Sequence, residues 1–180
     1  MKEKVMLITP TLQQGGLQRV CVRTAHLLAP YADVTVVVFN GADIAYDVSG
    51  LKIVDIGMGV KRGKMAKLFN IIRRAIRLRR LKRELQTAIA YSFGATANLA
   101  NAFSKTAKTK VWLGLRSYMD MGEHMKLRLF VRRCDRMICC SRRIERELRD
   151  KYNCDKTVTL YNPFDVERML REASSQEPIL

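Results

Sequence analysis

Two adjacent glycines near the start of the chain stand where backbone amides could approach a negatively charged ligand. Gly15 and Gly16 follow a short apolar run, 6–9, and precede a helical pattern. Adjacent glycines leave no Cβ in the way of a ligand, and the amino terminus of a helix favours anions. The spacing matches neither G-x-G-x-x-G nor a P-loop, whose Lys-Ser/Thr end is missing. The residues indicate an anion-binding loop or, alternatively, a turn that only leads into a helix.

A second group of candidate residues follows the apolar run 110–115. Arg116, Ser117 and Tyr118 come directly after it. A guanidinium is planar and carries a fork of donors that matches a phosphate group. Arg116 is therefore a candidate ligand for a phosphate, with an arginine solvated at the end of a strand as the alternative.

A third group contains groups that could transfer protons. Asp120, Glu123 and His124 lie close together in sequence and form a possible acid/base cluster, although solvated loop charges explain them as well. Further on, Asn162-Pro163 is a turn signal, and Asp165 could cap a following helix.

No metal site is expected from the sequence. The histidines are His26 and His124, and His26 lies on the buried pattern of a helix. Cys139 and Cys140 are adjacent, unlike the C-x-x-C spacing of zinc and redox motifs.

Short apolar runs alternate with helical patterns along the chain, which is typical of β-α-β units that build a parallel sheet. The expected strands are 6–9, 34–39, 53–56, 88–92, 110–115, 136–140 and 157–160. The expected helices are 17–29, 65–86, 95–104, 123–134, 142–152 and 166–173. We predict an α/β, Rossmann-like, doubly wound and mostly parallel sheet of about seven strands, with its ligand crevice beyond the carboxyl ends of the strands.

The composition fits one ordinary domain with a polyanionic partner. The chain has 180 residues, 48% of them apolar, and a formal net charge of +16. Its five cysteines show no disulfide spacing, which indicates a reduced, cytosolic protein. No run approaches the length of about 18 apolar residues that a membrane span needs.

Much of the charge lies in one segment. Residues 61–83 contain eleven Lys and Arg and no acidic residue. Their apolar residues repeat at helical spacing, which predicts a helix face packed on the sheet. These apolar residues are Met65, Leu68, Phe69, Ile72, Ala75 and Ile76, with Leu85 beyond the segment.

Such a run of cations is more than a solvated helix face requires, because like charges at helical spacing repel. We expect the segment to bind an anionic membrane surface, with about 1 kcal/mol from each cation near the lipid headgroups. The residues expected at this surface are Lys61, Arg62, Lys64, Lys67, Arg73, Arg74, Arg77 and Arg80. A basic nucleic-acid-binding domain is the alternative, but the segment has a single aromatic residue for base stacking, Phe69.

The order of these features resembles the N-terminal half of retaining GT-B glycosyltransferases of glycosyltransferase family four. The resemblance extends from Val5 to about Asp165. Its motifs are the Gly15-Gly16-Leu17-Gln18-Arg19-Val20 helix start, the alternating β and α elements, the strand that ends in Cys140-Ser141, and the strand that ends in Asn162-Pro163 before Asp165.

The resemblance implies a function as well as a fold. Family members have two Rossmann-like domains that face a cleft, and they bind the acceptor mainly with the first and the nucleotide-sugar donor with the second. They transfer the sugar with retention of configuration and without a bound metal or other cofactor. Residues 1–165 are thus expected to be the acceptor-binding domain and 166–180 the start of the connection to a donor-binding domain, so that this chain alone would be inactive.

The resemblance also assigns roles to residues of this sequence. Gly15 and Gly16 match the glycine loop that approaches the donor diphosphate or the reacting sugar. Many relatives carry a histidine in the loop after Leu115, where this chain has Arg116-Ser117-Tyr118, which leaves the catalytic residue unassigned. The acceptor-binding candidates are Arg116, Ser117, Tyr118, Asp120, His124 and Asn162. The expected acceptor is a saccharide. The resemblance implies a lipid-linked one at the inner face of the membrane, because several family members with lipid-linked acceptors attach to membranes through a basic surface of this domain.

Overall fold

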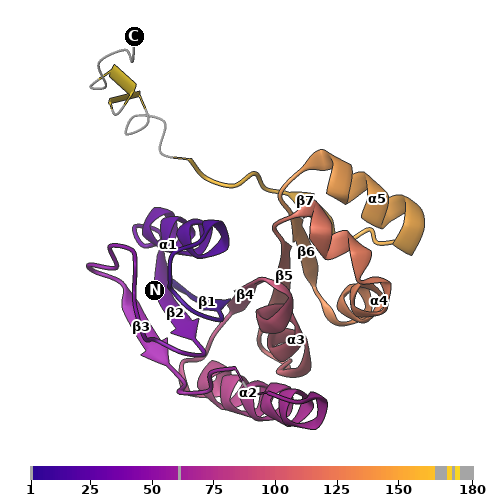
Figure 1. Ribbon diagram of the computed structural model, residues 1–180, viewed down its shortest axis with the longest axis horizontal. Helices are drawn as coiled ribbons and strands as arrows, with labels where there is room; N and C mark the ends of the chain where they lie inside the picture. Colours follow the sequence, from indigo (N-terminus) through magenta and orange to yellow (C-terminus); the bar gives the residue numbers. More distant parts are fainter. Residues whose placement is uncertain (1, 61, 165–169, 172, 175–180) are drawn as a thin grey trace.

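The computed structural model describes residues 2–60, 62–164, 170, 171, 173 and 174. Seven strands form one sheet in the order β3-β2-β1-β4-β5-β6-β7, and every neighbouring pair is parallel (Figure 1). The strands are β1 (Glu3–Thr9), β2 (Ala32–Val38), β3 (Lys52–Asp55), β4 (Ile89–Phe93), β5 (Lys110–Leu115), β6 (Arg136–Cys139) and β7 (Thr157–Thr159). The predicted α/β, Rossmann-like fold is confirmed, and each of the seven expected runs is a strand.

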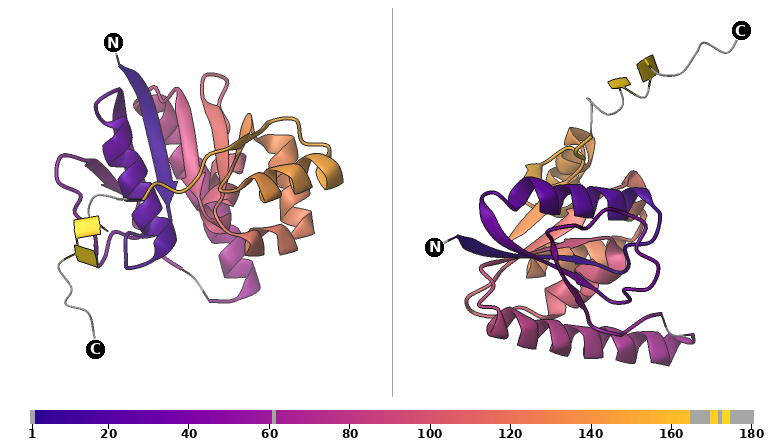
Figure 2. Two further views of the ribbon diagram at one scale, coloured as in Figure 1. Left: turned by 90° about the horizontal axis from the view of Figure 1, so that it is seen from above. Right: turned by 90° about the vertical axis from the view of Figure 1, so that its left-hand side faces the viewer.

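Helices connect these strands and cover the sheet on both faces. They are α1 (Gly16–Leu28), α2 (Lys64–Glu84), α3 (Ala95–Phe103), α4 (His124–Arg133) and α5 (Arg142–Tyr152), with a short 3-10 helix η1 (Tyr118–Gly122) that the sequence did not predict. The helix expected over 166–173 lies largely outside the described residues. Helix α1 packs on one face, whereas α2 and α3 lie on the other (Figures 1 and 2).

The core follows from the alternation of side chains along the strands. Val5 and Leu7 of β1 pack with Val20 and Ala25 of α1. The intervening Met6 and Ile8 face α2 and α3, and a third cluster joins β5 and β6 to α4 and α5. Burial of β2 on both faces explains the run of three consecutive valines, Val36 to Val38, at its carboxyl end.

Helix α3 is fixed to the sheet by two buried asparagines. Asn98 Nδ2 donates to the Gly114 carbonyl at 2.8 Å, and Asn101 Nδ2 donates to the Ala90 carbonyl at 2.9 Å. The Ser92 hydroxyl donates to Asn98 Oδ1 at 2.7 Å. Each buried amide is therefore satisfied by groups of β4 and β5, which sets the position of α3 on these strands.

The face that α2 buries differs from the expected one. Met65, Leu68, Phe69, Ile72 and Ile76 are exposed, with exposed fractions between 49% and 79%. The prediction that this stripe packs on the sheet is therefore wrong, apart from Ala75 and the partly buried Leu85 at its far end. The residues that α2 buries are Asn70, Arg74, Ala75, Leu78, Leu81 and Lys82.

Arg74 is one of two buried cations on α2, so its assignment to a membrane-binding surface is also wrong. Its side chain is 4% exposed. Its guanidinium donates to the carbonyls of Met58 and Gly59 at 2.5 to 2.9 Å and lies 4.3 Å from the centre of the Phe39 ring. Arg74 thus holds the loop before α2 against the helix, which is a structural role.

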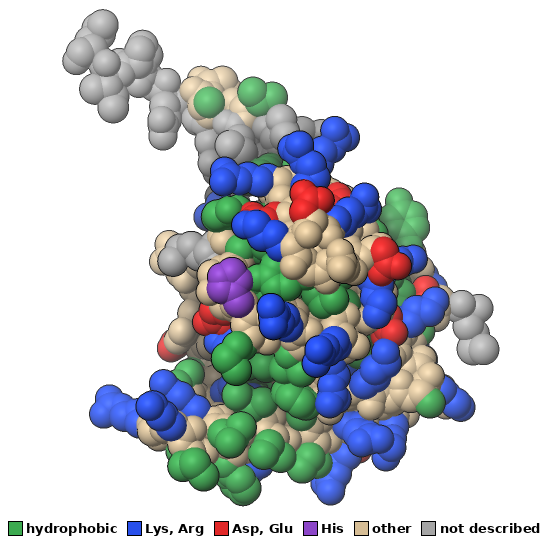
Figure 3. Space-filling model, turned by 90° about the vertical axis from the view of Figure 1, so that its right-hand side faces the viewer, with side chains coloured by type: hydrophobic (Ala, Val, Ile, Leu, Met, Phe, Trp, Pro, Cys, Tyr) green, Lys and Arg blue, Asp and Glu red, His purple; other side chains and the backbone are tan. Residues whose placement is uncertain are grey.

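The other predicted membrane-binding cations have varied positions. Arg62, Lys64, Lys67, Arg73 and Arg80 are exposed, and Arg77 is half-buried. Lys61 lies outside the described residues. Exposed cations on α2 and just before it thus accompany the exposed apolar residues of this helix, and Figure 3 shows hydrophobic side chains gathered along the lower edge of the molecule, where α2 lies, with Lys and Arg on both sides.

Lys82 is the second buried cation of α2, at 1% exposed. Its Nζ donates to Asn101 Oδ1 and Ser104 Oγ, both at 2.7 Å. Burial lowers the pKa of Lys82 from its ordinary value of 10.5 to about 7. Between these two values the unfolded chain binds one more proton than the folded chain, so stability rises with pH in this window.

We therefore predict a pH dependence that Lys82 causes. From pH 7 to pH 9, the free energy of unfolding of the wild type should increase by about 2 kcal/mol relative to that of Lys82→Met, because the methionine variant lacks the buried titrating group. Urea denaturation of both proteins across this range measures the difference. Parallel pH profiles would contradict the prediction.

Candidate functional site

The loops that carry the candidate residues meet at the carboxyl edge of the sheet. The glycine loop follows β1, Gly94 follows β4, Arg116 follows β5 and Asn162 lies beyond β7. Because all strands are parallel, these loops share one edge, with β1, β4 and β5 adjacent. Helix α1 leaves β1 towards β2, whereas α3 leaves β4 towards β5, so the strand order reverses between β1 and β4. The crevice that the sequence predicted belongs at this switch point, because open α/β sheets in general bind ligands there.

The glycine loop is held by a tyrosine that the sequence did not single out. Tyr46, between β2 and β3, accepts a hydrogen bond from the Gly15 amide at 2.7 Å and donates one to the Gly15 carbonyl at 2.6 Å. Gly15 precedes α1 without a side-chain cap, and no acidic residue lies in the first turn of this helix. The positive end of α1 is thus left without a protein carboxylate, while Tyr46 fixes the loop.

Gly94 is a further residue of this edge that the sequence analysis missed. It precedes α3 with φ +85°, a conformation that side chains with a Cβ rarely adopt. A Cβ on Gly94 would lie 2.9 Å from Cδ1 of Leu17 in the first turn of α1. The close approach of α1 and α3 at the crevice therefore depends on this glycine.

Arg116 has a position that its place in the sequence did not indicate. It is 9% exposed, and its guanidinium lies 5.3 Å and 5.2 Å from the ring centres of Tyr91 and Phe93. Its Nη1 donates to Asn162 Oδ1 at 3.0 Å and to the Leu160 carbonyl at 3.3 Å. The structure therefore brings Arg116 and Asn162 together and rules out an arginine solvated at a strand end.

The residues after Arg116 form a turn that Asp120 organises. Asp120 Oδ2 accepts from the backbone amides of Arg116 and Ser117 at 3.0 and 3.1 Å. Tyr118 is exposed, and the guanidinium of Arg143 lies 4.5 Å from the centre of its ring. Asp120 thus positions the backbone of the Arg116 loop.

The proposed acid/base cluster does not form. Asp120 is engaged with backbone amides, Glu123 pairs with Lys126, and His124 Nδ1 lies 2.5 Å from the hydroxyl of Tyr152. These three side chains turn to different partners because the chain passes from η1 into α4 between them. Within the described residues, no group of three or more His, Cys, Asp or Glu is arranged to hold a metal ion.

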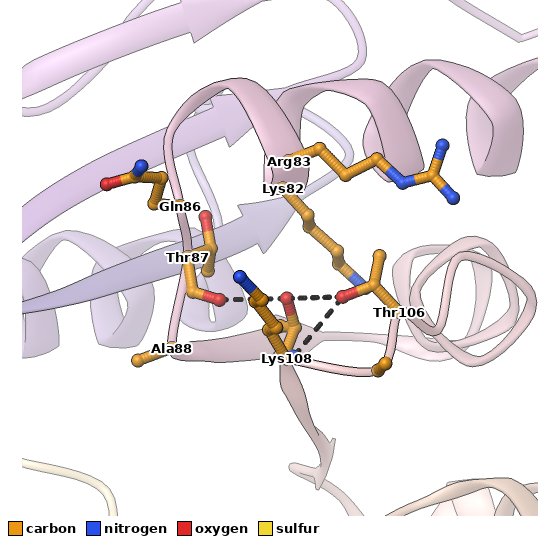
Figure 4. Close-up of a pocket in the computed structure, with 9 residues that line it drawn as sticks. Lys82, Arg83, Gln86, Thr87, Ala88, Thr106 and Lys108 are labelled. Atoms are coloured by element: carbon orange, nitrogen blue, oxygen red, sulfur yellow. Dashed lines mark hydrogen bonds between the residues drawn. The ribbon is translucent and has the colours of Figure 1, made fainter.

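The structure has a cavity of about 670 Å³ at the opposite edge of the sheet (Figure 4). Its lining includes Arg83, Thr87 and Lys108, and it lies at the amino ends of β4 and β5. Lys82 borders this cavity, but its Nζ is bound to Asn101 and Ser104. The cavity is therefore separate from the crevice. None of the described helices is long and apolar enough to cross a membrane.

The topology, with its switch point between β1 and β4, defines a Rossmann-like domain. The sequence profile of Glycosyltransferase Family 4 matches residues 14–168, and the chain belongs to this family. The resemblance found in the sequence is therefore confirmed. No curated protein sequence matches the chain significantly.

Solved structures of other proteins share the fold. The lipopolysaccharide outer core galactosyltransferase WaaB has a TM-score of 0.71 at 12% identity, over 91% of this chain and 46% of WaaB. Sucrose-phosphate synthase from Thermosynechococcus elongatus has a TM-score of 0.70 at 11% identity, over 98% of this chain and 53% of the synthase. HepE from Anabaena, in complex with UDP-glucose, has a TM-score of 0.65 at 13% identity, over 95% of this chain and 49% of HepE. The chain thus spans about half the length of these proteins.

The two glycines at the crevice allow a matched test of its geometry. We predict that Gly94→Ala lowers the free energy of unfolding by about 1–3 kcal/mol, because it places a Cβ at positive φ and against Leu17. Gly16→Ala should be neutral or stabilise by up to about 1 kcal/mol, because Gly16 is helical and its Cβ would meet no atom within 4 Å. Urea denaturation compares the two; equal effects would contradict this account of the crevice.

Proposed function

We propose that this chain is the acceptor-binding domain of a retaining glycosyltransferase that moves a sugar from a nucleotide-sugar donor to a saccharide. The observation that carries the proposal is the family match over 14–168 together with the loops that converge at the carboxyl edge. HepE was solved with UDP-glucose, which supports a nucleotide sugar as the donor. Residues 1–165 bind the acceptor, and 166–180 begin the connection to a donor-binding domain.

The chemistry expected of the site is electrostatic. The uncapped amino terminus of α1 offers a positive end close to where a leaving phosphate gains charge, and Tyr46 fixes the preceding loop. The reaction requires a nucleotide sugar as co-substrate and no other cofactor. Retention follows the pattern of the family, with front-face attack by the acceptor hydroxyl.

Saccharide binding tests the proposal directly. In saturation-transfer NMR, an acceptor saccharide should receive magnetisation from this chain, and Asp120→Ala should weaken binding because it releases the Arg116 loop. Incubation with a nucleotide sugar should give no transfer by this chain alone. Transfer by this chain alone, or the absence of binding across a panel of saccharides, would contradict an acceptor-binding domain that works with a separate donor domain.

We further propose that the acceptor is lipid-linked and that α2 holds the domain at the cytoplasmic face of a membrane. The specific observation is the exposed apolar surface of α2 beside exposed Lys and Arg, with no acidic residue from 62 to 83. Apolar side chains can enter the headgroup region while the cations bind anionic lipid. An enzyme with a lipid-carried acceptor gains from a search confined to the membrane plane.

The predicted effect of α2 can be measured by cosedimentation with vesicles at physiological salt. The wild type should bind anionic vesicles and not neutral ones. The double variant Arg73→Glu with Arg80→Glu should weaken binding at least tenfold, because it reduces the attraction to anionic headgroups. Phe69→Asp should also weaken binding, because it removes an apolar side chain that can enter the headgroup region.

A matched control is the double reversal Lys2→Glu with Arg19→Glu, which changes the net charge equally at exposed positions outside α2. Its affinity should stay close to that of the wild type. Equal loss in both double variants would contradict a surface on α2 and indicate a response to net charge alone. Competition by DNA at the same salt would favour the nucleic-acid alternative.

A further inference from the structure

Three buried polar atoms without a hydrogen-bond partner in the described protein lie on neighbouring side chains of β4, of β5 and of the loop after β5. They are Tyr91 Oη, Trp112 Nε1 and Arg116 Nε. Tyr91 and Trp112 face each other across β4 and β5, with ring centres 6.4 Å apart, and the Arg116 guanidinium lies 5.3 Å from the Tyr91 ring. Buried polar groups in proteins are nearly always paired, so three orphans together require a physical explanation.

Arg116 also lacks a counter-charge. None of the described carboxylates pairs with its guanidinium, and the acceptors that it reaches, Asn162 Oδ1 and the Leu160 carbonyl, are neutral. Asp120 lies nearby in sequence, but its Oδ2 binds backbone amides. Burial lowers the pKa of Arg116 to about 10, which still leaves it protonated near neutral pH. A buried cation without a counter-charge costs free energy that an anionic ligand would recover.

The other two buried cations, Arg74 and Lys82, differ from Arg116 in their hydrogen bonds. Arg74 donates to two backbone carbonyls with both Nε and Nη2, and Lys82 has acceptors from Asn101 and Ser104. Arg116 alone among these three keeps a buried N–H without an acceptor. A guanidinium with a free Nε–H edge presents the geometry that binds a phosphate through two oxygens.

We infer that Arg116, whose guanidinium packs on the rings of Tyr91 and Phe93, is the receptor for a phosphate group of the substrate. The inference rests on the proposed function only for the source of that phosphate, which is either the diphosphate of the nucleotide donor or a phosphate carried by the acceptor. Asn162 positions the guanidinium through its contact with Nη1. Arg116 would thus contact both the phosphate and the loop beyond β7.

Trp112 offers a direct readout, because it is the one tryptophan in the sequence. Its fluorescence should change in a saturable way on titration with inorganic pyrophosphate, in 0.3 M sodium chloride to screen the exposed cations. Arg116→Gln should weaken this binding at least tenfold, and Arg116→Lys should lie between, since lysine keeps the charge without the fork. The exposed Arg128→Gln serves as the matched control and should stay within twofold of the wild type.

Two further titrations, with UDP and with a sugar monophosphate, identify the source of the phosphate. Tighter binding of UDP than of a sugar monophosphate supports the donor diphosphate, and the reverse order supports a phosphorylated acceptor. Equal affinity of the wild type and Arg116→Gln for pyrophosphate would overturn the receptor, and so would the absence of binding. Neither result would touch the acceptor proposal, because the saccharide-binding test above uses no phosphate.

A second measurement does not depend on the folding of a variant. In the wild type, the Arg116 Nε–H resonance should shift on addition of pyrophosphate, because this N–H gains an acceptor. Phosphate should also raise the melting temperature of the wild type and not that of Arg116→Gln, since a ligand of the folded state stabilises it. An unmoved Nε–H resonance at saturating pyrophosphate would overturn the inference.

Discussion

Parallel pairing is the constraint on which the rest of this structure depends. After each strand the chain must run back to the opposite edge of the sheet before the next parallel strand can begin. The carboxyl ends of all the strands therefore lie at one edge. The reversal of strand order between β1 and β4 then places α1 and α3 on opposite faces of the sheet, with the predicted crevice at this switch point. Gly94 lets the two helices approach there, and Asn98 and Asn101 fix α3 by bonding to carbonyls of the strands below it. The candidate residues are close together because the topology brings their loops together.

None of the three buried cations, Arg74, Lys82 and Arg116, forms a salt bridge with a described carboxylate. Arg74 and Lys82 instead use carbonyl, amide and hydroxyl oxygens, which satisfy their donors without a second buried charge. Arg116 follows the same pattern only in part, because Nη1 is satisfied and Nε is not. A buried cation whose N–H donors all have acceptors in the protein stabilises the fold, whereas one with an unpaired N–H can bind a ligand. The net charge of the chain does not reveal this difference.

The strands could be predicted from the sequence because their signal is local. The segment 34–39 consists of β-branched residues followed by Phe39, and the structure places a buried strand there with a shift of one or two residues. The packing of α2 could not be predicted in the same way, since Asn70, Arg74 and Lys82 occupy core-facing positions and apolar residues such as Phe69 do not. Their partners are remote or belong to a loop, as Met58 is for Arg74. Tyr46 was missed for the same reason: it lies 31 residues from Gly15, and no motif marks their contact.

Hydrogen bonds connect α2 to the carboxyl edge of the sheet. Helix α2 runs from the loop after the edge strand β3 back to the central strand β4, and Arg74 joins its buried face to the carbonyls of Met58 and Gly59 in that loop. Met58 is bound in turn to the Phe39 carbonyl, immediately after β2 at the carboxyl edge. A membrane bound to the apolar and basic side of α2 would therefore fix the direction in which the carboxyl edge faces. This geometry makes the orientation of α2, as much as its charge, the property that a lipid-linked acceptor would require.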